Sequence, residues 1–383
     1  MSATCDSVAD RVTAYLGFSC HDANPIVTLR NPADLANATL PVLEILIIGG
    51  AIFAFVHALR RLRRDGDPTN LALWFASLVY LFVIEPPLYF PGWFGLDEQV
   101  GFIFAHNVFS VQFMYDRLPL YIVAIYPALS QLAYELVRSL GIFQRRGAFV
   151  GALCVAFVCQ VFYEIFDQLG PQLKWWAWNL DNKVNHPLLA AVPMNSIVLF
   201  ASVSFGAIVY LVVKLVGEPS WRGRQLRARS LVPRIVVAGA LAPIAMPIAS
   251  IPSALFGGSD PNTTAQAIVL AAEMVVLWVV GGTFLFRQWL ELRDTKEPVT
   301  LDAFVRIYPA IYLIVFALLW VYALPDFVGA EGGMTSDGTP IGNAPYTLAC
   351  FLAAGACVAA VLLLPRRGPA QQPPTRQVGA SMR

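Results

Sequence analysis

Long apolar runs, separated by short polar segments, follow one another along most of this 383-residue sequence. Each run is about 20 residues long, the length that an α-helix needs to cross a hydrocarbon core of roughly 30 Å. The alternating segments that mark membrane β-strands do not occur, and only helices or closed barrels satisfy their backbone inside a bilayer. The pattern therefore predicts an all-α integral membrane protein, a bundle of about nine transmembrane helices near residues 40–59, 71–90, 118–140, 148–169, 190–215, 232–255, 267–286, 304–324 and 346–364.

The polar segments divide the chain into three parts. Residues 1–39 carry several charged side chains and lack the apolar core of a removable signal peptide, so we expect an extracytoplasmic N-terminal segment. Residues 40–365 form the predicted transmembrane domain. Residues 366–383 are rich in Pro, Gln and Arg, a composition typical of a disordered tail, here on the cytoplasmic side.

Basic residues fall almost entirely into alternate loops, which predicts the orientation of the bundle. By the positive-inside rule the loops rich in Arg and Lys face the cytoplasm, so the N terminus lies outside and the C terminus inside. The predicted outer loops and N-terminal segment hold five basic residues: Arg11, Arg30, Arg117, Lys174 and Lys183. The predicted inner loops hold seventeen: Arg60, Arg61, Arg63, Arg64, Arg138, Arg145, Arg146, Lys214, Arg222, Arg224, Arg227, Arg229, Arg287, Arg293, Lys296, Arg366 and Arg367.

Composition supports the membrane class and suggests a compartment. Hydrophobic residues make up 57% of the chain and charged residues 13%, which is unusual for a soluble domain. The net charge of +1 gives no reason to expect a nucleic-acid partner. Only four of the 26 basic residues are Lys, a bias found in GC-rich bacterial genes, so we expect a multi-pass protein of a bacterial inner membrane.

Two of the six cysteines lie in the predicted outer segment. Cys5 and Cys20 would face an oxidising space, where a disulfide between them is stable. The other four lie inside predicted spans as small core residues. His21, His106 and His186 are predicted to be extracytoplasmic but lack a paired helical spacing, so the sequence predicts neither a metal site nor a cofactor.

Four carboxylates lie in the outer halves of predicted spans, where ionisable groups usually face a partner or a cavity. Glu85 precedes two prolines, so we expect its helix to kink or end there. Glu164 and Asp167 are three residues apart and share one helical face, with Gln160 one turn deeper. Glu273 lies about two turns into its span. We predict catalytic roles for Glu85, Glu164 and Asp167, and a substrate-binding role for Glu273.

Aromatic and polar residues crowd the predicted outer loops. An aromatic belt at the membrane interface and simple helix-to-helix hydrogen bonds would explain such residues without any activity. The functional interpretation is a substrate-binding wall, with Arg117 as a clamp for a polar end group. Its predicted members are His106, Asn107, Arg117, Trp175, Trp176, Trp178, Asn179 and Asn195.

The same layout occurs twice, in residues 71–140 and 148–215. In each copy an acid closes the outgoing helix, an aromatic loop follows, and the returning helix opens with Pro119 or Pro193. Two such hairpins are expected to face each other across a shared cavity.

Three segments also carry a family resemblance. They read Arg117-Leu-Pro-Leu-Tyr-Ile-Val-Ala-Ile-Tyr-Pro, Phe166-Asp-Gln-Leu-Gly-Pro-Gln-Leu-Lys-Trp-Trp-Ala-Trp-Asn and Val192-Pro-Met-Asn-Ser, and they resemble an uncharacterised family of polytopic membrane proteins. The layout of acid-ended helix, aromatic loop and Pro-started helix is similar, more faintly, to that of carotenoid hydratases and fungal transmembrane terpene cyclases. That second resemblance implies protonation of an alkene or epoxide.

A membrane-embedded enzyme is accordingly the leading hypothesis. A buried carboxylic acid would protonate a hydrophobic isoprenoid or lipid and start a cyclisation or hydration, with aromatic faces stabilising the cation. Asp-rich diphosphate-binding motifs, DxDD, GxSxG and HExxH are absent from the sequence, which argues against prenyl transfer and hydrolysis.

Two alternatives remain open at this point. In a proton- or cation-coupled transporter or flippase, the same acids would bind the coupling ion. The sequence counts against it, because the polar residues crowd the outer side and no second cluster is evident in the inner half. In a structural protein, the acids would only hold helices together. The oligomeric state is not predicted by the sequence.

The predicted orientation can be tested by labelling. A membrane-impermeant amine reagent should modify Lys183 in intact cells, while the cysteine introduced by Arg224→Cys should be protected from an impermeant thiol reagent. Peptide mapping by mass spectrometry measures both. The reverse pattern would overturn the orientation and every inference about sides.

Overall fold

The computed structural model describes residues 5–21, 23–31, 33–98, 100–182, 184–258, 260–296 and 298–365. Lys183 and the predicted tail at residues 366–383 lie outside the described residues. The described part of the chain contains nine helical segments that are long and apolar enough to cross a membrane. The predicted helical membrane bundle is thus confirmed.

Seven of the nine crossings are single helices on the predicted spans, and the other two are composite. The first four are α2 (Leu40–Asp65), α3 (Thr69–Tyr89), α4 (Leu120–Ser139) and α5 (Ile142–Asp167). The last three are α11 (Thr263–Thr295), α12 (Ala303–Val328) and α13 (Ala344–Leu362). Within α5, Gly147 has φ 82° and interrupts the helix one residue before the predicted start of that span. As expected from Pro86 and Pro87, α3 ends close by, at Tyr89.

The fifth and sixth crossings are composite. The fifth consists of the π-helix η2 (Ser196–Ser204), α6 (Phe205–Val212), the π-helix η3 (Val213–Gly217) and α7 (Glu218–Trp221). The sixth consists of α8 (Ala228–Leu241), the 3-10 turn η4 (Ala242–Ile244) and α9 (Ala245–Ala249), and the short α10 (Ile251–Ala254) follows it. In the sixth crossing, Pro243 lies in η4 and Pro247 lies within the short α9, and proline cannot continue the backbone hydrogen bonding of a helix.

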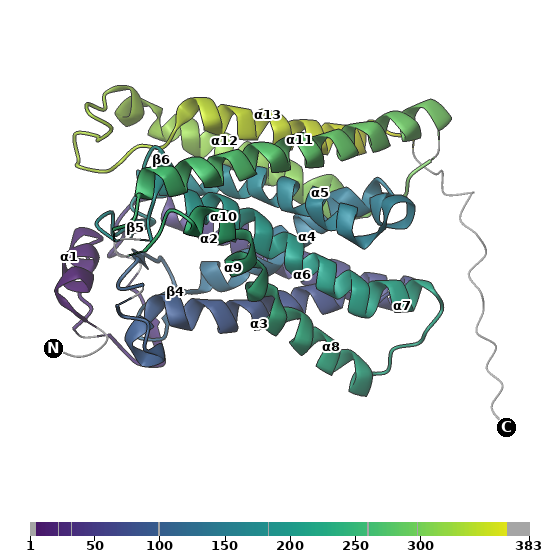
Figure 1. Ribbon diagram of the computed structural model, residues 1–383, viewed down its shortest axis with the longest axis horizontal. Coiled ribbons are helices and arrows are strands. Elements are labelled where there is room, and N and C mark those ends of the chain that lie inside the picture. Colours follow the sequence, from purple (N-terminus) through teal and green to yellow (C-terminus); the bar gives the residue numbers. More distant parts are fainter. Residues whose placement is uncertain are drawn as a thin grey trace.

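The helices lie side by side along the long axis of the molecule (Figure 1). One end carries α1 (Ser7–Tyr15) and the short strands, and the other carries α7 (Figure 1); we call them the α1 end and the α7 end. In the 18-residue apolar stretches of α4 and α5, 89% and 83% of the residues are buried, against 17% in that of α11. The bundle is therefore built around α4 and α5, with α11 at its lipid-facing edge.

Short strands connect the loops at the α1 end, a feature that the sequence did not predict. β2 (Phe104–His106) pairs antiparallel with β5 (Trp176–Trp178), joining the two loops of the expected hairpins. A second sheet contains β1 (Val27–Leu29), β3 (Val111–Phe113) and β4 (Leu118–Pro119). β6 (Pro187–Leu189) pairs with β7 (Val192–Pro193), and the 3-10 turn η1 (Pro91–Phe94) follows α3. β4 and β7 lead directly into the returning helices.

The N-terminal segment is fastened onto these strands. Cys5 and Cys20 are joined by a disulfide, with their Cα atoms 5.6 Å apart. The Asn107 side-chain amide donates to the Leu16 carbonyl at 2.8 Å, and Leu16 packs with Ala105 and Ala177 of the β2–β5 pair. α1 therefore lies over the β2–β5 ribbon as a cover.

A second polar cluster lies near the α7 end, and here the sequence interpretation was wrong. We name it the α7-end network: His57, Asn70, Gln131, Glu135 and Arg138. Arg138 donates to both oxygens of the Glu135 carboxylate at 2.7 Å, and the Asn70 amide donates to it at 2.9 Å. The His57 ring nitrogen lies 3.4 Å away. The cluster could not be predicted from the sequence, because its members come from three helices and are brought together only by packing.

Three side chains in the same region are close enough to bind a metal ion together, but arginines already pair with their carboxylates. Ligand atoms of His57, Glu135 and Asp302 lie within 4.8 Å of one another. However, Arg64 is 2.9 Å from Asp302 and Arg138 is 2.7 Å from Glu135, so guanidinium groups take the carboxylate oxygens that a metal ion would need. We therefore interpret the group as a salt-bridge network.

Glu135→Gln should destabilise the protein strongly. The amide keeps the size of the side chain but leaves Arg138, whose side chain is only 14% exposed, without its main counter-charge, a loss of about 3–5 kcal/mol in the free energy of unfolding. The control is Glu291→Gln, which breaks the half-exposed Arg146–Glu291 pair and should cost about 0–1 kcal/mol. Thermal unfolding in detergent measures both, and equal shifts would contradict a structural role for the network.

Candidate functional site

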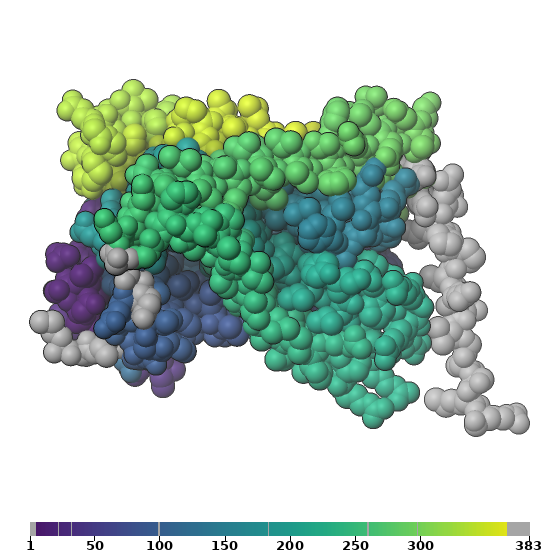
Figure 2. Space-filling view, viewed as in Figure 1, coloured from purple at the N-terminus to yellow at the C-terminus, as the bar shows by residue number. Residues whose placement is uncertain are grey.

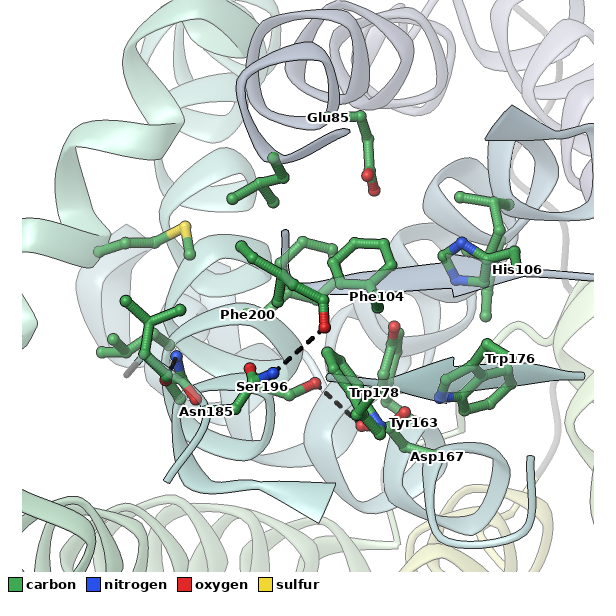
Figure 3. A pocket seen from close by; sticks show the side chains of 18 of the residues that line it. Glu85, Phe104, His106, Tyr163, Asp167, Trp176, Trp178, Asn185, Ser196 and Phe200 are labelled. Atoms are coloured by element: carbon green, nitrogen blue, oxygen red, sulfur yellow. Dashed lines mark hydrogen bonds between the residues drawn. The ribbon is translucent and has the colours of Figure 1, made fainter. Parts of the chain in front are cut away.

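A cavity of about 220 Å³ lies beneath the β2–β5 ribbon, between α3, α4, α5 and η2 (Figure 3). Residues of both expected hairpins line it, with an apolar and aromatic surface. The polar groups among its lining residues are Glu85, Tyr126, Tyr163, Asp167, Ser196, His106, Asn185, Asn195, Trp176 and Trp178.

Glu85 enters the cavity from α3, one residue before the two prolines. Its side chain is 3% exposed. One carboxylate oxygen, Oε1, accepts a hydrogen bond from the Tyr126 hydroxyl of α4. The other, Oε2, is buried and makes no hydrogen bond of ordinary geometry among the described residues, although the Tyr89 hydroxyl also interacts with this carboxylate. Glu85 therefore presents one oxygen to whatever fills the cavity.

Asp167 lies on the other side of the cavity, at the last residue of α5 (Figure 3). The Ser196 hydroxyl, at the start of η2, donates to its carboxylate at 2.9 Å. Tyr163, one turn earlier on α5, also lines the cavity. The two acids thus come from different helices and are separated by the cavity, with aromatic rings between them (Figure 3).

The β2–β5 ribbon forms the roof. The His106 ring nitrogen Nδ1 lies 3.1 Å from the Tyr89 hydroxyl, and burial lowers the pKa of His106 to about 3, so this imidazole is neutral at pH 7. The indole N–H groups of Trp176 and Trp178 are buried without an acceptor in the described part of the chain. Unpaired donors in such a place are expected to meet a bound molecule or water.

Several residues predicted for the site lie elsewhere. Glu164 is fully buried but outside the cavity lining; Gln168 donates to its Oε2 at 3.3 Å. Gln160 joins helices instead, accepting from Trp278 at 2.6 Å. Glu273 lines a separate groove. The cavity lining also lacks four predicted loop residues, Asn107, Arg117, Trp175 and Asn179.

Those four loop residues hold the α1 end together. Trp175 donates from its indole nitrogen to Thr39 at 2.9 Å, and Asn179 donates to the Phe102 carbonyl at 2.8 Å. The Arg117 guanidinium lies 5.0 Å from the centre of the Phe102 ring, and burial lowers its pKa. These contacts account for the four residues as parts of the fold, and no role in binding is needed to explain them.

Sequence reasoning missed some cavity residues and one buried acid. Tyr126 and Ser196 lie within segments that carried the family resemblance, which was the available signal. Glu44, a fifth carboxylate near the α1 end, accepts from the backbone of Phe109 and Ser110. Because loop groups donate hydrogen bonds to both of its oxygens, Glu44 anchors α2 to the loop between α3 and α4.

Comparison with known proteins identifies no relative: no family model, no curated protein and no solved structure matches the chain. The family resemblances drawn from the sequence are thus without support from these comparisons. The nine apolar helices of the described residues identify a multi-pass membrane protein in contact with the bilayer.

Gly170→Ala should disturb the roof of the cavity. Gly170 lies under the Trp176 indole, and an added Cβ would overlap that ring. Overpacking of this kind costs about 1–3 kcal/mol, so the melting temperature should fall and the tryptophan emission spectrum should change. Gly355→Ala is the control, because no atom lies within 4 Å of a Cβ at that position. Equal behaviour of the two variants would show that Gly170 does not hold Trp176 in place.

Proposed function

We propose that this protein is a membrane-embedded enzyme that cyclises or hydrates a hydrophobic, unsaturated isoprenoid or lipid by acid initiation. The observation that carries the proposal is the pair Glu85 and Asp167, placed on opposite sides of an apolar and aromatic cavity. The family resemblance of layout points to the same chemistry, and the expected location is a bacterial inner membrane.

The geometry suits different roles for the two acids, with Glu85 as the proton donor and Asp167 as the proton acceptor. Glu85 donates a proton from Oε2 to one carbon of a double bond; the π electrons form the new C–H bond and leave a carbocation. In a cyclisation, a second double bond attacks this cation, and Asp167 removes a proton from the adjacent carbon of the final cation. In a hydration, water adds to the cation and Asp167 takes its proton. Proton transfer of this kind is worth about 10²–10⁴-fold in rate.

The cavity walls support such a cation. The faces of Trp176, Trp178 and Phe104 offer the negative side of the aromatic quadrupole. The apolar residues of α4 and η2 keep bulk water away, which protects the cation from premature capture. The Ser196 hydroxyl steadies the Asp167 carboxylate in the position of a base.

A proton- or cation-coupled transporter remains the second candidate, and one observation favours it. The α7-end network puts a buried carboxylate, Glu135, near the opposite end of the bundle. Its oxygens are already taken by Arg138 and Asn70, however, so Glu135 is poorly suited to bind and release an ion. In the third candidate, a structural protein, Asp167 and Ser196 would only tie α5 to η2.

The enzyme proposal is tested with purified full-length protein in nanodiscs and a panel of C15–C40 isoprenoids. In ordinary water, mass spectrometry should detect a product of unchanged mass for cyclisation, or of 18 mass units more for hydration, and D₂O should leave one carbon-bound deuterium in the product. Flux across liposomes without conversion would favour the transporter. If neither conversion nor flux is detected, the structural protein is the candidate that the result favours.

Glu85→Gln and Asp167→Asn should each lower turnover by about a hundredfold or more, since an amide cannot donate or accept the proton. Glu164→Gln is the matched control: it lies one turn from Asp167 and is equally buried, but outside the cavity. It should keep turnover within a few-fold. Loss of activity in the control alone would assign the chemistry to Glu164 and overturn the cavity pair.

A further inference from the structure

A second hollow opens on the lipid-facing side of the bundle. It is a groove of about 750 Å³ between α5, the η2–α6 crossing, α9–α10 and α11. Figure 2 shows a recess on this face between α11 and the elements α9 and α6. Small residues make room for it, among them Ala152 and Ala156 of α5 and Gly206 and Ala207 of α6. Its size and apolar lining suit a hydrocarbon chain.

Glu273 of α11 is the one carboxylate among the residues that line the groove. It is the seventh residue of the apolar run 267–286, about 9 Å along the helix from the start of that run at 1.5 Å per residue. No hydrogen bond or ion pair to Glu273 occurs within the described ranges of the chain. A carboxyl group at this depth needs a partner, and its short side chain cannot reach the interface.

The groove and the cavity share a wall. On η2, Leu199 and Phe200 line the cavity while Val198 and Ser202 line the groove. On α9, Met246 lines the cavity, and the next residues along, Ile248 and Ala249, line the groove. One π-helical segment and one five-residue helix therefore separate the two spaces. Such π-helical segments are rare and frequently mark functional sites.

We propose that the groove is a lateral entry site for a long-chain lipid alcohol, whose hydroxyl donates a hydrogen bond to Glu273 while its chain lies along α5 and α6. Binding in the groove stands by itself; delivery from the groove to Glu85 and Asp167 rests on the proposed function. A neutral hydroxyl fits better than an ammonium group, because a charged group would lose more hydration free energy beside the apolar lining of the groove.

The experiment uses the full chain in nanodiscs and a C20 isoprenoid alcohol that carries a diazirine and an alkyne. The comparison probe is the methyl ether of the same chain, which cannot donate a hydrogen bond. Peptide mapping should place the alcohol cross-links on α6 and α11, with labelling saturable by unlabelled alcohol. Labelling by the ether should be weaker by about fivefold or more.

Glu273→Leu removes the hydrogen-bond acceptor and puts an apolar side chain at a lipid-facing position, so the fold should be preserved. Labelling by the alcohol should fall to the level of the ether, while labelling by the ether should not change. Ala207→Phe fills the groove and should lower labelling by both probes. Equal labelling by the two probes, cross-links outside the groove, or no effect of Glu273→Leu would each overturn the entry site.

The two proposals fail separately. If the probes behave as expected but no isoprenoid is converted, the groove site stands and the proposed enzyme is wrong. If conversion occurs and Glu273→Leu leaves its KM unchanged, the enzyme stands and the entry site is wrong. A raised KM with unchanged kcat in Glu273→Leu is the result expected when both are right, because Glu273 then acts before the chemical step.

Discussion

A hydrocarbon core offers no hydrogen-bond partner, and this constraint decides which helices of the bundle can carry polar chemistry. α4 and α5 are the most buried crossings, with 89% and 83% of the residues in their 18-residue apolar stretches buried. Accordingly they hold Tyr126, Gln131 and Glu135 on α4, and Gln160, Tyr163, Glu164 and Asp167 on α5. The outer helices could not hold such a set, because each side chain would face lipid. The cavity lies where it does because these two helices are covered on nearly every side.

The same constraint separates structural acids from candidate catalytic ones. Glu135 and Glu44 have donors on both oxygens, as a buried carboxylate that only stabilises the fold should. Among the described residues, Glu85 keeps one oxygen without a hydrogen bond of ordinary geometry, and that oxygen belongs to a cavity-lining side chain. Glu164 also keeps one, but its side chain does not line the cavity. An incomplete set of partners therefore points to function only where a cavity lies beside it.

The sequence predicted the nine helices because the bilayer imposes their length and polarity locally, and it predicted that Glu85, Asp167 and Glu273 lie in the helix halves toward one common end. It did not predict their lateral positions. Glu164 and Asp167 are one helical turn apart, yet only Asp167 lines the cavity, together with Tyr163 and Phe166 of the same helix, so the cavity lies to one side of the predicted stripe. The β2–β5 ribbon joins two segments that are about 70 residues apart in the sequence. Neither segment shows the alternating polarity of a strand, so no local pattern predicts the ribbon. The α7-end network is hidden for a similar reason: its members come from different helices.

The proposed route into the cavity agrees with what closes its other sides. At the α1 end, the β2–β5 ribbon forms a roof and α1 lies over the ribbon, held by Asn107 and by the Cys5–Cys20 disulfide. Below the cavity, α3 and α4 are packed together through Ser77 and Ser130, whose hydroxyls lie 2.9 Å apart. The remaining side is the wall of η2 and α9, where prolines and π-helical backbone replace regular helix. A hydrophobic molecule dissolved in the bilayer meets this wall first, so the least regular part of the bundle lies between the lipid and the acids.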